Sequence, residues 1–189
     1  MMAQLLYQIL DWLFGFLTMA LLARFLMQWT RASFRNPLGT FVVAVTDWAV
    51  KPARRLIPSA FGFDMPSLLL AWLTQAVFHT LAFLLGGTGS LPTAIGGVAL
   101  LAAISVVRVG IYLLIGVIVF SALLSWINPH APLAPVINAV ARPFLRPVQR
   151  LIPLVGGVDL SPVVVLLALQ ILLTVLASLQ RTLLPLVIG

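Results

Sequence analysis

The segment "KPARRLIP" at residues 51–58 returns almost unchanged as "RPVQRLIP" at residues 146–153. The two copies lie 95 positions apart in a chain of 189 residues, and the same offset places Asp64 over Asp159. Similarity at a fixed offset is typical of a chain built from repeated structural units. The sequence therefore predicts two copies of one unit, each with this basic, proline-containing segment in its middle.

The rest of the chain is strongly apolar. Hydrophobic residues make up 62%, charged residues 8%, and the mean hydropathy is +1.16, whereas a typical soluble domain has about 25% charged residues. We therefore expect a membrane protein. The charged residues are ten Arg, one Lys and four Asp. The cations flank apolar segments and lack interleaved aromatic residues, so we expect anionic lipid headgroups as their partner and not nucleic acid.

Four apolar segments reach the length of about 20 residues that a membrane-spanning helix needs. They are residues 5–29, 65–85, 106–127 and 160–179. Each half of the chain then reads as a helix, a basic loop and a helix. We expect an all-α membrane protein with four transmembrane helices, arranged as two parallel repeats at residues 1–90 and 91–189.

The basic residues predict the orientation of the chain in the membrane. The loops after the first and third spans carry eight Arg or Lys residues, while the connector "GGTGSLPTAIGG" at residues 86–97 carries none. Loops rich in Arg and Lys are normally cytoplasmic. We therefore expect both basic loops in the cytoplasm and both termini on the opposite side, although Arg181 near the carboxyl end opposes this orientation weakly.

Both basic loops show helical periodicity. Apolar residues recur at spacings of three and four at about residues 38–56 and 133–152, which predicts amphipathic helices lying in the membrane interface. Proline residues within these segments should bend them. The cations expected to contact lipid headgroups are Lys51, Arg54, Arg55, Arg142, Arg146 and Arg150.

Two carboxylates stand directly before the second and fourth spans. Asp64 lies in "DMPS" and Asp159 in "DLSP". A carboxylate at this position can accept hydrogen bonds from the first turn of a helix, so we expect capped helices with an ion pair to Arg55 and Arg150 at the membrane surface. The alternative is a carboxylate that coordinates a cation or gates its passage.

Polar residues also occur inside the spans. The repeat places Asp11 and Arg108 at matching depths in the first and third spans, and Gln75 and Gln170 in the second and fourth. Charges within a span are costly and should pair or reach water. Asp11 and Arg108 should therefore form an ion pair with each other or reach headgroups separately. The glutamines should form hydrogen bonds between helices or line a solute path, and Arg24 should reach the cytoplasmic surface.

The composition argues against catalysis. The chain has no Cys and no Glu, and its two histidines fall on opposite sides of a span. It contains no nucleophile elbow, phosphate-binding loop, dinucleotide fingerprint or metalloprotease motif. We therefore expect a protein that is not an enzyme and that has no cofactor and no metal site.

The repeated motif resembles that of the YggT family of integral membrane proteins, in which an Asn-Pro pair precedes a basic turn into RLIP and an acidic helix start. The segment "PVQRLIPLVGGVDLSP" at residues 147–162 fits this pattern more closely than the first copy, where Pro66-Ser67 reverses the Ser-Pro order. The motif positions are Asn36, Pro37, Arg55, Pro58, Asp64, Asn128, Pro129, Arg150, Pro153, Asp159, Ser161 and Pro162.

The resemblance implies a bacterial inner-membrane protein that supports envelope or ion homeostasis under osmotic or extracytoplasmic stress. An alternative implied by plastid and cyanobacterial relatives is a scaffold or assembly factor for a partner complex, as in cytochrome maturation or cell division. The expected partners are anionic lipids, together with a second copy of the chain or another membrane protein.

Overall fold

The computed structural model describes residues 2–57, 63–86, 91–152 and 159–188. These residues form six helices and no β-strand. The helices are α1 (Met2–Trp29), α2 (Pro37–Leu56), α3 (Met65–Gly86), α4 (Leu91–Ile127), α5 (Ala134–Gln149) and α6 (Ser161–Ile188). Four of them, α1, α3, α4 and α6, are long and apolar enough to cross a membrane. The predicted all-α fold with four spans is confirmed.

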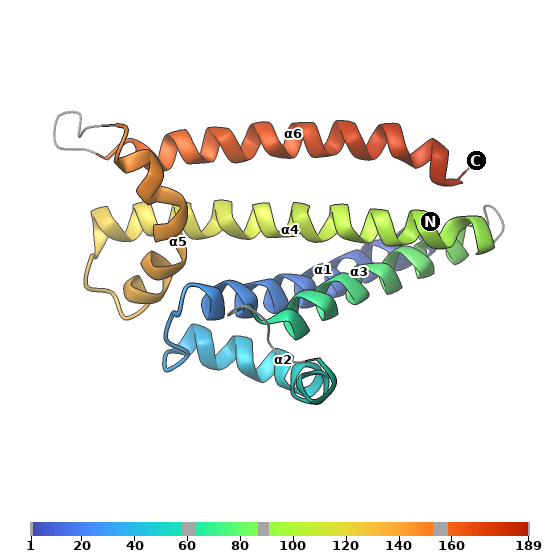
Figure 1. Cartoon of the computed structure of the whole chain (residues 1–189), viewed down its shortest axis with the longest axis horizontal. Coiled ribbons are helices and arrows are strands. Elements are labelled where there is room, and N and C mark those ends of the chain that lie inside the picture. The colour runs from blue at the N-terminus through green and yellow to red at the C-terminus, as the bar shows by residue number, and fades with distance from the viewer. Residues whose placement is uncertain (1, 58–62, 87–90, 153–158, 189) are drawn as a thin grey trace.

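The two halves of the chain run the same way (Figure 1). In each half a span leads to a shorter helix, α2 or α5, and a second span returns, so that both termini lie at the other end of the bundle. α1 packs mainly against α3, α4 packs against α6, and α3 joins the halves through α4. Among the described elements α6 contacts only α4 and α5, so most of its surface remains open for lipid.

α4 is longer than the sequence predicted. We expected a span at residues 106–127, preceded by a glycine-rich loop, but the helix begins at Leu91. Pro92 suits the first turn of a helix because its missing N–H group needs no partner there. The residues that follow Gly96 are mainly Ala, Leu and Val, and Ala and Leu favour a helix strongly enough to offset the cost of a glycine pair.

The start of α2 depends on Asn36, Pro37 and Gly39. Asn36 is extended, and its Oδ1 accepts the backbone N–H of Gly39 at 2.9 Å, which caps the helix. Pro37 occupies the first turn. A Cβ atom on Gly39 would lie 2.6 Å from the backbone of Phe34, so glycine is required where the preceding loop crosses the helix.

The second Asn-Pro pair has a different place in the fold. Asn128 follows the last residue of α4 directly, and its backbone N–H donates to Leu124 at 3.0 Å. α5 begins six residues later, at Ala134, with Leu133 in the capping position and no side-chain cap. The same motif letters therefore cap a helix in the first repeat and follow one in the second.

α2 and α5 are not confined to the end of the bundle. The ring of Phe41 near the start of α2 lies 6.2 Å from the ring of Phe16, in the middle of α1. Val136 and Val140 of α5 belong to a buried cluster with Leu26 on α1. Both helices thus pack along the spans, and their placement at the headgroup level stays a prediction.

Candidate functional site

A buried group of charged residues joins α1, α2 and α3, and Arg24 is its centre. Arg24 is only 5% exposed. Its Nη1 donates to Thr46 Oγ1 and to Asp47 Oδ1, both at 2.8 Å, and its Nε lies 3.9 Å from Asp64 Oδ2. The expectation that Arg24 reaches the surface is wrong, because α2 and α3 bring two carboxylates over the end of α1. Pairing with these carboxylates offsets part of the cost of taking the Arg24 charge out of water.

Asp64 is fully buried at the start of α3. Its Oδ2 accepts a hydrogen bond from Arg54 Nη2 at 2.9 Å and another from Ser67 Oγ at 2.7 Å. Arg54 also donates to Gln28 Oε1 on α1 at 2.8 Å. The predicted partner, Arg55, is exposed instead. We call Arg24, Asp47, Arg54 and Asp64 the first-repeat cluster; its two carboxylates and two guanidinium groups balance in charge.

Asp47 lies at the edge of this cluster. Its Oδ2 forms an ion pair with Lys51 at 2.7 Å, one helical turn further along α2. The hydrogen bond from Lys51 lowers the pKa of Asp47 below its ordinary value, and the contact with Arg24 lowers it further, against the opposing effect of burial. Asp47 is therefore ionised at neutral pH and keeps Arg24 neutralised.

The second repeat places Asp159 at the corresponding position before α6. Its Oδ1 accepts the backbone N–H of Ser161 at 2.9 Å, and its Oδ2 accepts Gln149 Nε2 at 2.8 Å. The predicted cap on the fourth span is thus present. The predicted ion pair with Arg150 is not among the ion pairs of the described residues, because Gln149 occupies the place that Arg54 has in the first repeat.

The environment of Asp159 still favours its charged form. Burial raises the pKa of Asp159, but hydrogen bonds from Ser161 and from Gln149 outweigh this effect. The net result is a pKa below the ordinary value. Asp159 is therefore a carboxylate at neutral pH, and among the described residues it has hydrogen-bond donors but no ion-pair partner.

Asp11 and Arg108 share a cavity of about 400 Å³ in the half of the bundle away from α2 and α5, together with Gln75. No ion pair joins Asp11 and Arg108 in the described structure. Arg108 Nη1 instead lies 3.3 Å from Gln180 Oε1 on α6. Since both charges border the same polar space, water can solvate them there.

The two glutamines have different environments. Gln75 is buried, and its Nε2 donates to Thr18 Oγ1 on α1 at 2.9 Å. Gln170 is exposed on α6. The expected hydrogen bond between helices thus occurs only in the first repeat, because the partner threonine has no counterpart facing Gln170.

The motif residues do not gather into one site. Asn36 and Pro37 begin α2, while Asn128 and Pro129 lie exposed beyond α4. Ser161 is buried at the start of α6, and Pro162 lines a pocket beside it. Two motif residues, Pro58 and Pro153, lie outside the described residues.

Several residues of these sites escaped the sequence analysis. Thr46 and Asp47 lie on α2, and they meet Arg24 of α1 only because α2 packs on α1. One signal was available: an arginine five residues before the end of a span needs a counterion if it is buried. Ser121 and Asn138 of the second repeat, joined at 2.8 Å, gave no such signal because neither is charged.

These features define a multi-pass membrane protein built from two parallel repeats, each with a helix packed beside one end of its spans. The family model CCB3/YggT matches residues 3–85 and 100–180, so the chain belongs to the CCB3/YggT family. It is 35% identical over 157 residues to the protein PA0392 of Pseudomonas aeruginosa, covering 80% of this chain and 77% of that protein. It is 34% identical over 156 residues to YggT of Escherichia coli strain K12, covering 82% and 80%. No solved structure matches the chain.

Proposed function

We propose that the chain is a non-enzymatic protein of the bacterial inner membrane that supports the envelope under osmotic or extracytoplasmic stress by binding anionic lipid headgroups. The observation that carries this proposal is a pair of equivalent exposed segments. Arg55 and Leu56 end α2, and Arg150 and Leu151 follow α5. Leu56 and Leu151 are 84% and 82% exposed. An exposed leucine beside an exposed arginine suits the boundary between acyl chains and phosphate groups.

The remaining cations of α2 and α5 support the same proposal. Lys51, Arg142 and Arg146 are also exposed, and Arg54 is partly exposed although it contacts Asp64. Each Lys or Arg near an anionic membrane surface contributes about 1 kcal/mol to the attraction. Both basic segments would face the cytoplasm, because Arg-rich segments are retained on that side of the membrane. Both termini would then face the periplasm.

Two sets of polar groups at or within the spans have partners that suit a structural role. The first-repeat cluster is charge-balanced, and His79 Nε2 lies 2.8 Å from Ser105 Oγ. These contacts leave the groups engaged with one another, which supports a structural rather than a catalytic role or a solute path. The scaffold alternative shares the same exposed cations and differs in its partner, a membrane protein complex in place of lipid.

The test measures retained lipid and ion flux on the purified chain. We expect phosphatidylglycerol to bind. The double substitution Arg55→Gln and Arg150→Gln should lower the affinity for this lipid about tenfold or more, because two interfacial charges are lost. Arg181→Gln, at the opposite end, is the matched control. The same double variant should fail to restore growth at high osmolarity to a bacterium lacking its own family member.

Two outcomes would contradict this proposal. If lipid binding is unchanged while the double variant loses a co-purifying membrane complex, the scaffold alternative is supported. If the protein in pure liposomes conducts ions under an osmotic gradient and Gln75→Leu abolishes the flux, the protein is a transporter.

A further inference from the structure

The two repeats differ in how they fill one equivalent space, enclosed by the end of the first span, the shorter helix and the start of the second span. In the first repeat the first-repeat cluster fills it. Matching Trp29 with Trp126 and Asp64 with Asp159 shows what stands there in the second repeat. Arg24 is replaced by Ser121, Arg54 by Gln149 and Asp47 by Arg142, while the carboxylate of Asp64 is kept as Asp159.

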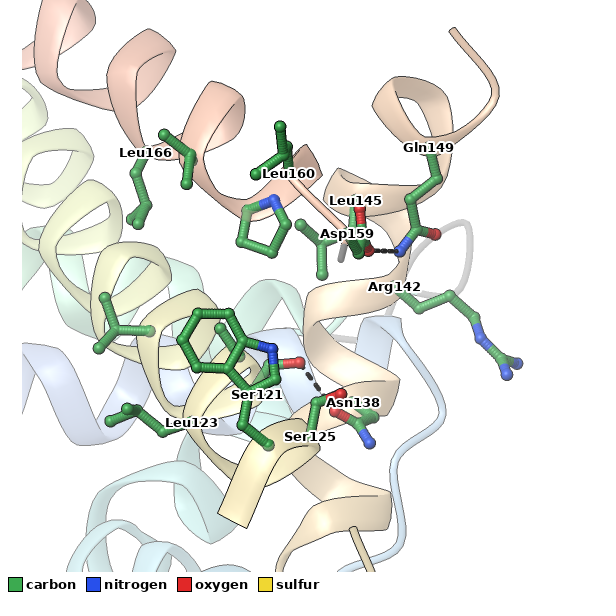
Figure 2. A pocket seen from close by; sticks show the side chains of 15 residues that line it. Ser121, Leu123, Ser125, Asn138, Arg142, Leu145, Gln149, Asp159, Leu160 and Leu166 are labelled. Carbon is green, nitrogen blue, oxygen red and sulfur yellow. Dashed lines mark hydrogen bonds between the residues drawn. The ribbon is translucent and has the colours of Figure 1, made fainter. Parts of the chain in front are cut away.

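These replacements leave a pocket of about 550 Å³ between α4, α5 and α6 (Figure 2). Two guanidinium groups have been replaced by a shorter hydroxyl and an amide, and the counterpart of Asp47 turns outward. The first-repeat positions that correspond to the lining of this pocket include Leu22, Val50 and Ala71, which are buried together in the core. The pocket is therefore a consequence of lost side chains at a place that the fold otherwise closes.

The pocket carries a carboxylate without a counterion. Asp159 forms no ion pair with any described residue, and the nearby hydroxyl of Ser161 is buried without a hydrogen-bond partner among them. Arg142 lines the same pocket, but its guanidinium points away from Asp159 (Figure 2). A simple cation would be repelled by Arg142 and a simple anion by Asp159, whereas a zwitterion would be attracted by both.

One side of the pocket is apolar and open. Val119, Leu123, Trp126 and Val163 line it and are 38%, 42%, 70% and 53% exposed. These residues lie on α4 and α6, two of the four helices that are long and apolar enough to cross a membrane. The occupant should therefore carry an apolar chain below its charged groups, as a membrane lipid does.

We propose that this pocket binds the phosphoethanolamine headgroup of a phospholipid. The primary ammonium donates to Asp159 and takes the place of the guanidinium groups of Arg24 and Arg54. The phosphate is bound by Arg142, whose side chain is exposed and can turn toward it. One acyl chain lies along Leu123 and Val163.

The test compares two lipids and one soluble headgroup on the purified full-length chain by native mass spectrometry. Phosphatidylethanolamine should bind about tenfold more tightly than phosphatidylcholine, whose quaternary ammonium cannot donate the charge-assisted hydrogen bond. Glycerophosphoethanolamine provides the same headgroup without acyl chains. It should compete only weakly with phosphatidylethanolamine. Effective competition at equal concentration would show that the pocket binds the free headgroup and not a lipid.

Three variants locate the site. Asp159→Asn retains a side chain able to cap α6 and should abolish the preference for ethanolamine over choline. Ser121→Arg restores the arginine of the first repeat and should block both lipids. Ser33→Arg adds the same charge at an exposed position outside the pocket and should leave the preference unchanged.

Equal binding of the ethanolamine and choline lipids by the wild-type chain would overturn the proposal, and so would a preference that survives Asp159→Asn. This inference does not rest on the proposed function. Binding of phosphatidylglycerol through Arg55 and Arg150 is measured separately and should be unchanged in Asp159→Asn, so the two proposals fail independently.

Discussion

At the residue scale, Arg24 connects three helices through charged contacts that are mostly out of water. It reaches Asp47 on α2 and lies near Asp64 on α3. Removing one partner from a buried ion pair is far more costly than removing the whole pair, since the remaining charge stays desolvated. Losing a single member of the first-repeat cluster should therefore destabilise the fold, because a charge that it neutralised stays buried.

We expect Arg24→Met to lower the free energy of unfolding by about 3 kcal/mol, the low end of the cost of removing one partner from a buried ion pair, because Asp64 keeps Arg54 and Asp47 keeps Lys51. Thermal unfolding in detergent measures the change. Arg35→Met, at an exposed position, should leave the Tm nearly unchanged. Equal Tm values for the two variants would show that the cluster does not stabilise the fold.

The cluster also predicts a dependence of stability on pH. The pKa of Asp47 in the folded protein lies below its ordinary value of 3.8. A lowered pKa stabilises the folded state above the unfolded-state value, and this contribution is lost as the pH falls through the folded-state pKa. We expect the contribution of Asp47 to the Tm to be constant above pH 3.8 and to decrease in more acidic buffer.

Asp47→Asn should remove part of this acid sensitivity. The measurement is the Tm difference between wild type and variant as the pH falls from neutral to below 3.8. The difference should shrink on acidification, because the wild-type carboxylate becomes protonated and loses its advantage. A difference that stays constant would mean that Asp47 does not couple protonation to folding.

At the scale of single elements, the start of α2 shows how tightly the loop and helix approach each other. Gly39→Ala would place a Cβ atom 2.6 Å from the Phe34 backbone, and overpacking of this kind costs about 1–3 kcal/mol. We expect a clear loss of thermal stability in Gly39→Ala.

The matched control is Gly96→Ala in the unexpected first part of α4. Apart from the neighbouring residues and the backbone of the same helix, no described atom lies within 4 Å of the added Cβ, so this substitution should stabilise the helix by about 0.5–1 kcal/mol. A loss of stability in Gly39→Ala and a gain in Gly96→Ala would agree with the close approach at α2 and with the early start of α4. Destabilisation by Gly96→Ala would argue that residue 96 lies in a loop.

At the scale of the whole molecule, the parallel arrangement places α2 and α5 at one end and both termini at the other (Figure 1). The chain has no cysteine, so single cysteines report position cleanly. We expect Arg55→Cys and Arg150→Cys to react with an impermeant maleimide from the cytoplasmic side, and Met2→Cys to react from the periplasmic side. Labelling of residues 55 and 150 from different sides would contradict the two-repeat topology.

The sequence by itself determined the membrane class, the four spans and the twofold repeat. These follow from composition and from periodicity, which depend on residues near one another in the chain. Two bounds of the spans agree with the prediction, since α1 ends at Trp29 and α3 begins at Met65, whereas α6 continues to Ile188, beyond the predicted end at residue 179. α4 begins earlier than predicted, because the glycine pair near its start is typical of a loop.

Only the tertiary structure decided what the polar residues do. Arg24 became buried and Gln170 exposed, although both lie in apolar spans, because burial depends on which helix packs against each face. The same motif aspartate is neutralised by arginines in one repeat and stands beside an open pocket in the other. That difference arises from Ser121 and Gln149, which line one pocket with Asp159 only after α4, α5 and α6 have packed together.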